Sequence, residues 1–382
     1  MIKRTIWLER IRQSWQKAPL VWLTGVRRSG KTTLAGMIPE ARYINCDLPS
    51  SARLLLDLEG FYESISETVV IFDEIHKLDN PSQVLKVGTD HFKHLRLLAT
   101  GSSTLAATKK FRDSLTGRKR VVHLLPVLEK ELAAFGVKDI KKRLLHGGLP
   151  EPLLADKKDP EFFSEWLDSY FARDVQELFR VGKRRNFLAL VEQVLRHSGG
   201  LLDQSKLARQ CGISRPTVGT YLDALDLTYL AFFVRPYHAG GNQELVRQPK
   251  VYGFDTGFVT HVRGWTELRE EDLGILFEHL VLESLVATAG IEAIRFWRDK
   301  QKREVDFVLP HGRSAAHAIE CKLNPDKVPT AALLAFRGLH PKGENFVVSP
   351  RVKEAYKRKI NNLAITFCSL GQLVDLIDTS AR

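Results

Sequence analysis

The sequence of 382 residues predicts an α/β protein with a buried parallel sheet, followed by helical segments and a second α/β region. An apolar run over residues 20–24 leads into a glycine-rich loop and then a helix. A second apolar run, residues 68–72, ends in two acids, as expected for a strand buried on both faces. From about residue 270 onward, a helical pattern precedes several short strand patterns.

Composition narrows the class of protein. The chain is 44% hydrophobic and 27% charged, which predicts a globular protein of about two to four domains. Lys plus Arg (57) exceed Asp plus Glu (45), and the net charge of +12 favours an anionic partner such as nucleic acid. No apolar run is long enough to span a membrane, and the first residues predict an amphipathic helix rather than a secretory signal. Four scattered cysteines predict neither a zinc site nor a disulfide framework, so we expect a cytoplasmic setting.

The loop over residues 25–32 fits the pattern G-x-x-x-x-G-K-[ST] at every fixed position. Glycines let backbone N–H groups surround a phosphate, and the following helix directs its positive end at the same group. The ammonium of Lys31 can reach the β- and γ-phosphates, and the Thr32 hydroxyl can bind Mg²⁺. The alternative is an ordinary glycine turn, which the strand–loop–helix order disfavours. The predicted nucleotide contacts are Gly25, Arg28, Ser29, Gly30, Lys31, Thr32 and Thr33.

The acids after the second apolar run complete this site. Asp73 is predicted to join the Mg²⁺ shell, and Glu74 to act as the general base for the attacking water. The alternative is a helix cap. The next strand, residues 95–103, ends in hydroxyl residues, of which Ser102, ahead of Thr100, is the candidate γ-phosphate sensor. Turn chemistry explains the same hydroxyls equally well.

A basic turn, residues 117–120, precedes a further strand. An arginine here is placed to reach a neighbouring subunit and neutralise charge on its γ-phosphate. Arg118 is the first candidate and Arg120 the second, which predicts a homo-oligomer. A solvated basic turn is the competing interpretation.

Together these residues resemble AAA+ ATPases of bacteria and archaea, in which an N-terminal ATPase is fused to a C-terminal region of unknown function. The resemblance covers nearly the whole chain and implies ATP and Mg²⁺ as cofactors. It is specific for ATP binding at the loop and the acidic strand, but not for a cellular role. It is carried by residues 25–34, 72–76, 98–103, 115–118, 147–151, 170–174 and 250–257, and the last of these suggests no chemical role.

The expected division of the chain is an AAA+ core over residues 1–128, a helical lid over 129–185, a winged helix over 186–249 and a nuclease-like domain over 250–382. In the lid, Arg173 follows an aromatic helix face and is a candidate nucleotide contact. An ion pair with the adjacent acid is the alternative.

Residues 187–236 predict a winged helix. A helix closed by Gly212 precedes a second helix capped by Ser214, and a strand follows. The side chains expected to contact DNA phosphates or bases are Lys206, Arg215, Thr217 and Thr220. The same module used only for protein contact is the alternative.

The C-terminal region resembles the PD-(D/E)xK nuclease core. A helix carries Glu278, one strand carries Asp306, and the next carries Glu320 and Lys322, which the strand period places on one face. The three carboxylates would bind Mg²⁺ and the lysine would activate a water. The alternative is a polar strand face that packs against nothing, or a nuclease fold kept as a DNA-binding platform.

The sequence thus predicts an ATP-hydrolysing AAA+ protein that remodels or translocates on DNA, with branched DNA suggested by the likeness to junction-cleaving nucleases. Repair or recombination is the expected setting. An ATP-regulated, Mg²⁺-dependent nuclease is one alternative. A signalling ATPase whose winged helix binds protein is the other.

Overall fold

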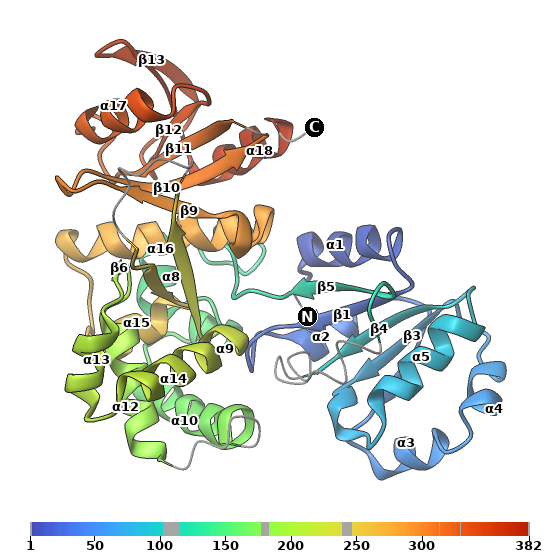
Figure 1. Cartoon of the computed structure of the whole chain (residues 1–382). Helices are drawn as coiled ribbons and strands as arrows, with labels where there is room; N and C mark the ends of the chain where they lie inside the picture. Colours follow the sequence, from blue (N-terminus) through green and yellow to red (C-terminus); the bar gives the residue numbers. More distant parts are fainter. Residues whose placement is uncertain are drawn as a thin grey trace. The chain divides into compact units, whose positions relative to one another are not determined.

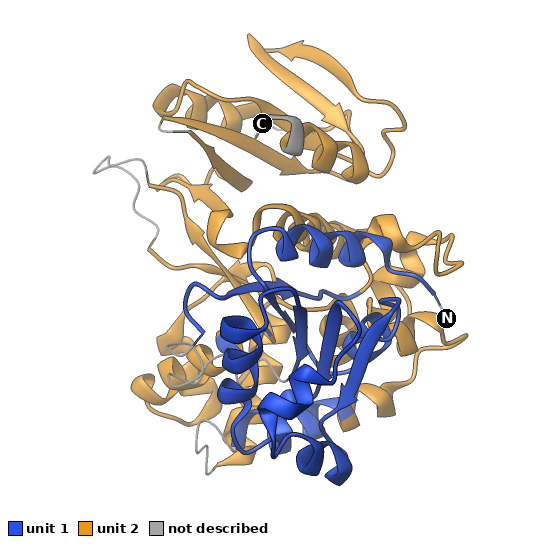
Figure 2. Cartoon of the chain, turned by 90° about the vertical axis from the view of Figure 1, so that its right-hand side faces the viewer, with its two compact units in different colours: residues 1–126, 166–182, 227–229 blue, residues 127–165, 183–226, 230–382 orange. Residues whose placement is uncertain are grey.

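The computed structural model describes residues 2–101, 115–176, 183–238, 247–312, 314–328 and 330–380. The chain forms two compact units (Figure 2). Unit 1 comprises residues 1–126, 166–182 and 227–229, and unit 2 comprises residues 127–165, 183–226 and 230–382.

Unit 1 contains a five-stranded parallel sheet in the order β2-β3-β4-β1-β5 (Figure 1). All five residues of β1 are buried, as its apolar run predicts. Because β1, β4 and β3 run parallel, the loop after β1 and the acids at the end of β3 emerge at the same edge of the sheet, with the end of β4 between them. The strands are β1 (Leu20–Thr24), β2 (Ala41–Asn45), β3 (Val69–Asp73), β4 (Arg96–Thr100) and β5 (Lys119–His123).

Helices cover this sheet. The N-terminal helix is amphipathic as predicted, and it buries Trp7 and Ile11. Trp22 and Phe72 of the sheet and Tyr62 of a neighbouring helix belong to one apolar cluster. The helices of residues 2–101 are α1 (Thr5–Trp15), α2 (Lys31–Ala35), α3 (Pro49–Leu54), α4 (Leu58–Glu63), the 3₁₀ turn η1 (Ile75–Lys77) and α5 (Pro81–His91).

The predicted lid is helical, but its helices do not stay in one unit. Helix α10 (Pro160–Tyr170) begins in unit 2 and enters unit 1 at Trp166, where a π-helical turn, η3 (Phe171–Val175), follows. The preceding elements all belong to unit 2. They are η2 (Glu129–Glu131), α8 (Ile140–His146) and α9 (Pro150–Leu154).

The next part of unit 2 has three helices and three short antiparallel strands. Gly212, at a φ of 61°, ends α13, and the Ser214 hydroxyl accepts a hydrogen bond from the Thr217 amide (3.2 Å) at the start of α14, both as predicted. Strand β8 lies between β6 and β7. The elements are α12 (Arg184–Arg196), β6 (Gly200–Leu201), α13 (Gln204–Cys211), α14 (Arg215–Leu227), β7 (Ala231–Pro236) and β8 (Lys250–Gly253).

These strands continue into the C-terminal region, because β7 also pairs with β9. The result is one nine-stranded sheet in the order β13-β14-β12-β11-β10-β9-β7-β8-β6. The expected boundary at residues 249/250 therefore falls inside a sheet, between two paired strands. The remaining elements are α15 (Thr256–Val262), α16 (Glu270–Ala289), η4 (Ile291–Ala293), β9 (Arg295–Arg298), β10 (Glu304–His311), β11 (Ala315–Cys321), α17 (Thr330–Leu339), β12 (Asn345–Val348), β13 (Tyr356–Ile360), β14 (Leu363–Cys368) and α18 (Leu370–Ser380).

The stretches 147–151 and 250–257 meet in the interior of unit 2. The Asp255 carboxylate accepts hydrogen bonds from the amides of Gly148 (2.6 Å) and Gly257 (2.7 Å). The fully buried guanidinium of Arg143 pairs with Glu283 and donates to the Thr256 hydroxyl (3.0 Å). These stretches therefore join α8, α15 and α16 into one core.

No helix in the described part of the chain is long and apolar enough to cross a bilayer. All four cysteines are free thiols in the structure.

Candidate nucleotide site and a second carboxylate cluster

The loop after β1 requires glycine at two positions. Gly25 has a φ of +149°, and a Cβ there would lie 2.5 Å from the carbonyl oxygen of Leu124. Gly30 has a φ of +93° and immediately precedes the first residue of α2. Both conformations disfavour any residue with a side chain, which is the reason that the motif fixes glycine at these two points. Of the other predicted contacts, Ser29 is buried, whereas Arg28, Thr32 and Thr33 are exposed.

Lys31 is the central cation of this site. Its side chain is folded back so that Nζ donates to the carbonyl oxygens of Gly25 and Val26, each at 3.0 Å. Burial lowers the pKa of Lys31, while Glu74 and Asp174 act in the opposite direction. Among the described residues no carboxylate lies within ion-pair distance of Nζ, so the positive charge is held by neutral acceptors alone.

Two side chains that are distant in sequence donate hydrogen bonds to backbone carbonyls in and beside the loop. Buried Arg4 donates to the carbonyl oxygens of Ser29 (3.2 Å) and Leu125 (3.0 Å). The Trp166 indole donates to the carbonyl oxygen of Arg27 (3.1 Å). Since the C=O and N–H of one peptide plane point in opposite directions, fixing these carbonyls also fixes the orientation of the amides. Sequence reasoning missed both residues, because no local pattern marks them.

The acids lie where the sequence predicts, at the end of β3. Asp73 is 3% exposed, and both of its carboxylate oxygens accept hydrogen bonds from hydroxyl groups. Thr100 donates to Oδ1, and Tyr43 donates to Oδ2 at 2.6 Å. Glu74 has a φ of 54°, and its carboxylate is 3.1 Å from His76 Nδ1.

The hydroxyl of Thr100 is fully engaged within the chain, because it also accepts a hydrogen bond from the Glu74 amide (3.0 Å). It therefore orients both acids. Ser102, the first candidate for the γ-phosphate sensor, lies outside the described residues.

Arg118 forms a two-pronged ion pair with Asp90 of α5, with Nε and Nη2 at 2.6 and 3.1 Å from the two carboxylate oxygens. Arg120 and Arg173 are exposed. A role for Arg118 or Arg120 at a neighbouring subunit, or for Arg173 at the nucleotide, stays a prediction.

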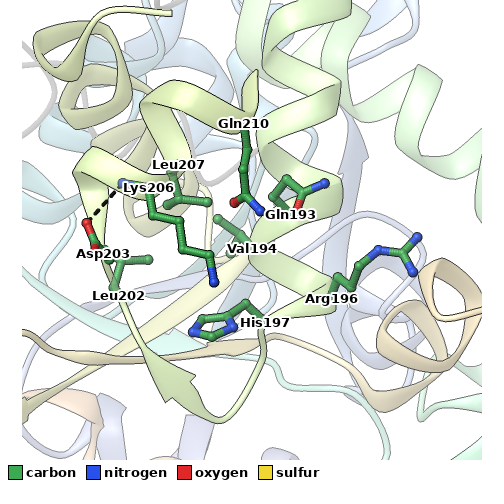
Figure 3. Close-up of a pocket in the computed structure, with 9 residues that line it drawn as sticks. All are labelled: Gln193, Val194, Arg196, His197, Leu202, Asp203, Lys206, Leu207 and Gln210. Atoms are coloured by element: carbon green, nitrogen blue, oxygen red, sulfur yellow. Dashed lines mark hydrogen bonds between the residues drawn. The ribbon is translucent and has the colours of Figure 1, made fainter. Parts of the chain in front are cut away.

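The predicted DNA-contacting residues lie on α13 and α14. Lys206, Arg215 and Thr220 are exposed, and Thr217 is half-buried. Lys206 lines a pocket of about 200 Å³ between α12 and α13 (Figure 3). Two further basic side chains, Arg196 and His197, line it, and its one acid, Asp203, is engaged as the N-cap of α13.

The C-terminal candidates converge in unit 2, together with a lysine that sequence reasoning did not single out. Lys322 Nζ lies 2.7 Å from Glu320 Oε2 and 3.3 Å from Asp306 Oδ2. Lys250 Nζ lies 2.8 Å from Glu278 Oε1 and 2.9 Å from a carboxylate oxygen of Glu304. These residues form what we call the carboxylate–lysine cluster: Lys250, Glu278, Glu304, Asp306, Glu320 and Lys322.

The alternative interpretation, a polar strand face that packs against nothing, does not hold for Glu320. Glu320 is 1% exposed, because α16 packs on this face of β11 while Ile319 is buried on the other. Burial, together with the nearby charge of Asp306, raises the pKa of Glu320 to about 8, although Lys322 acts in the opposite direction. Its Oε1 has no hydrogen-bond partner.

Within the described ranges, no group of three or more His, Cys, Asp or Glu side chains is arranged to hold a metal ion. Lysines lie against these carboxylates instead. Metal binding by Glu278, Asp306 and Glu320 stays a prediction.

Three family models match consecutive parts of the chain. Residues 17–133 match "AAA domain", residues 137–269 match a domain of unknown function (DUF8612), and residues 273–368 match another (DUF4143). An uncharacterized protein of Mycobacterium tuberculosis is 28% identical over 322 residues, covering 81% of this chain and 71% of that protein. An uncharacterized protein of Haemophilus influenzae is 22% identical, covering 69% of this chain and 74% of that one.

Among solved structures, a Walker-type ATPase of Pyrococcus abyssi is 17% identical, with a TM-score of 0.42, over 69% of this chain and 96% of that one. DnaA from Aquifex aeolicus is 10% identical, with a TM-score of 0.30, over 58% and 87%. The family match, the parallel sheet and the glycine-rich loop identify residues 17–133 as a P-loop domain of the AAA type.

Proposed function

We propose that this chain binds and hydrolyses ATP at the loop after β1. The observation that carries the proposal is that Lys31, whose Nζ donates to two backbone carbonyls, lies near Asp73 and Glu74 at one edge of the sheet. Lys31 would contact the phosphates, and the amides at the start of α2 would surround them. Glu74 would accept the proton of the attacking water.

The residues present fit a Mg²⁺ ion. Mg²⁺ prefers oxygen ligands and needs one or two from the protein beside those of the nucleotide. The exposed Thr32 hydroxyl and the Asp73 carboxylate supply them. Bound there, the ion would neutralise charge on the phosphates.

We further propose that the protein acts on DNA as a homo-oligomer, remodelling or translocating on it, with branched DNA as the preferred form. The net charge of +12 and the exposed Lys206 and Arg215 support an anionic partner. The order of α12 to β8, with a three-stranded antiparallel arrangement, supports a winged helix. Arg118 is the candidate for acting across a subunit boundary, where it would have to leave Asp90.

ATP turnover should be measured with no DNA, single-stranded DNA, duplex DNA and a four-way junction. We expect DNA to accelerate turnover, most for the junction, and Glu74→Gln to reduce it by about 10²–10⁴-fold with ATP still bound. DNA affinity should fall steeply with salt. Turnover that DNA leaves unchanged, together with no salt-dependent affinity, would favour a regulatory ATPase whose α13 and α14 bind protein.

The nuclease alternative is favoured by one observation, the convergence of Asp306, Glu320 and Lys322. Nicking of plasmid DNA with Mg²⁺ tests it. Under this alternative Lys322→Ala abolishes nicking and spares ATP turnover, and equal nicking by that variant indicates a contaminating enzyme.

A further inference from the structure

The carboxylate of Asp73 accepts hydrogen bonds from hydroxyl groups on both neighbouring strands. Strand β3 lies between β2 and β4. Thr100, at the end of β4, donates to one oxygen, and Tyr43, in β2, donates to the other at 2.6 Å. Asp73 itself is 3% exposed, so water has little access to compete with these two donors.

Two hydroxyl donors fix the orientation of a carboxylate and still leave acceptor sites on its oxygens for a cation. Each carboxylate oxygen has two acceptor sites, so an oxygen that accepts one hydrogen bond can still bind a cation. Partners in the second shell of a metal orient its ligand, and their loss typically weakens metal binding by about 10–100-fold. The two hydroxyls also carry no charge, so they leave the negative charge of Asp73 in place.

We propose that Tyr43 is a positioning residue for the Mg²⁺ that accompanies the nucleotide, acting through Asp73. This inference rests on the proposed function of the loop after β1. Thr100 shares the role, but it also accepts from the Glu74 amide, so its removal disturbs two acids at once. Tyr43 is the cleaner test, because its hydroxyl contacts Asp73, the residue is 39% exposed, and it does not belong to the apolar cluster around Trp22.

Tyr62 provides a matched control in the same unit. Its hydroxyl donates to the carbonyl oxygen of Val84 (2.9 Å), and its ring belongs to the apolar cluster. Tyr62→Phe therefore removes one tyrosine hydrogen bond, as Tyr43→Phe does, without touching Asp73. An effect of Tyr43→Phe that Tyr62→Phe does not share cannot come from the loss of a hydroxyl alone.

The experiment is a fluorescence titration of the full chain with a methylanthraniloyl-labelled ATP analogue, first in EDTA and then with increasing Mg²⁺. For Tyr43→Phe we expect unchanged affinity in EDTA and a rise of about tenfold in the Mg²⁺ concentration that gives half of the Mg²⁺ effect. The Mg²⁺ dependence of ATP turnover should shift equally. Tyr62→Phe should shift neither, and circular dichroism checks that both variants fold.

Two results contradict the inference in different ways. If Tyr43→Phe folds, binds the analogue and shows the Mg²⁺ dependence of the parent, the positioning role is wrong and the proposed function stands. If the parent shows no nucleotide binding that responds to Mg²⁺, both are wrong.

Discussion

Two buried lysines, Lys31 in unit 1 and Lys250 in unit 2, differ in what neutralises them. Lys31 donates to two backbone carbonyls, whereas Lys250 contacts the carboxylates of Glu278 and Glu304. Burial lowers the pKa of Lys31; at Lys250 burial acts the same way, but Glu278 and its other negative neighbours outweigh it and raise the pKa. The charge of Lys31 is thus available to an incoming anion, while that of Lys250 serves the fold.

The largest expected effect on function is on ATP binding. Lys31→Met should weaken the affinity for a labelled ATP analogue by about two orders of magnitude, since it removes the cation that would contact the phosphates. Lys86→Met, which changes an exposed lysine of α5, should leave the affinity unchanged. Equal affinity in the two variants would contradict the assignment of Lys31.

The same substitution at the other lysine should act on stability instead. Lys250→Met removes a buried cation from the half-buried carboxylates of Glu278 and Glu304, and breaking such a pair costs up to about 3–5 kcal/mol. Lys31→Met should lower the free energy of unfolding by less, because it leaves two neutral carbonyl oxygens without a donor and no charge without its partner. Urea unfolding followed by circular dichroism measures both. Similar losses of unfolding free energy in the two variants would contradict the proposed difference between Lys31 and Lys250.

A smaller effect is expected from pH. The pKa of Glu320 is raised to about 8, so between its ordinary value of 4.5 and about 8 the native state binds a proton that the unfolded state has released. Stability must therefore fall as pH rises through this range, by about 2 kcal/mol from pH 6 to pH 8 for this group. Burial raises the pKa of Glu283 to about 8 as well, so the parent should show a steeper fall.

Glu320→Gln cannot release this proton and should lose less stability than the parent over the same range. Thermal unfolding at several pH values measures the difference. If the stability of the parent rises from pH 6 to pH 8, the predicted direction of the pH dependence is wrong.

The smallest expected effect is that of Mg²⁺ without nucleotide. Because Lys250 and Lys322 lie against the carboxylates, millimolar Mg²⁺ should leave the melting temperature of the parent unchanged. A rise that disappears in Glu320→Gln would instead favour the nuclease alternative.

The local sequence pattern was sufficient to predict the loop after β1, the acids at the end of β3, the end of α13 and the start of α14. In each case neighbouring residues in sequence determine the conformation, as Gly25, Gly30 and Ser214 show. The convergence of Asp306, Glu320 and Lys322 was also predictable, because consecutive strands tend to pair.

The features that the sequence did not predict depend on packing between segments that are distant in sequence. The burial of Glu320 follows from the position of α16, and no strand period reveals which face a helix covers. The contacts of Arg4, Tyr43 and Trp166 with the nucleotide site span 25 to 139 residues of sequence. The stretch 250–257 acquired a role only when Asp255 was seen to bind the amides of Gly148 and Gly257.

The hydrogen bonds from Arg4 to the carbonyl oxygens of Ser29 and Leu125 affect the choice of a protein for expression. The AAA-domain match begins at residue 17, whereas Arg4 and the helix that follows it lie before that point. A truncated protein made to those limits would lack the guanidinium that fixes the Ser29 carbonyl, and would expose the apolar surface that Trp7 and Ile11 cover. Expression work aimed at nucleotide binding should therefore keep the first sixteen residues and place affinity tags at the opposite terminus.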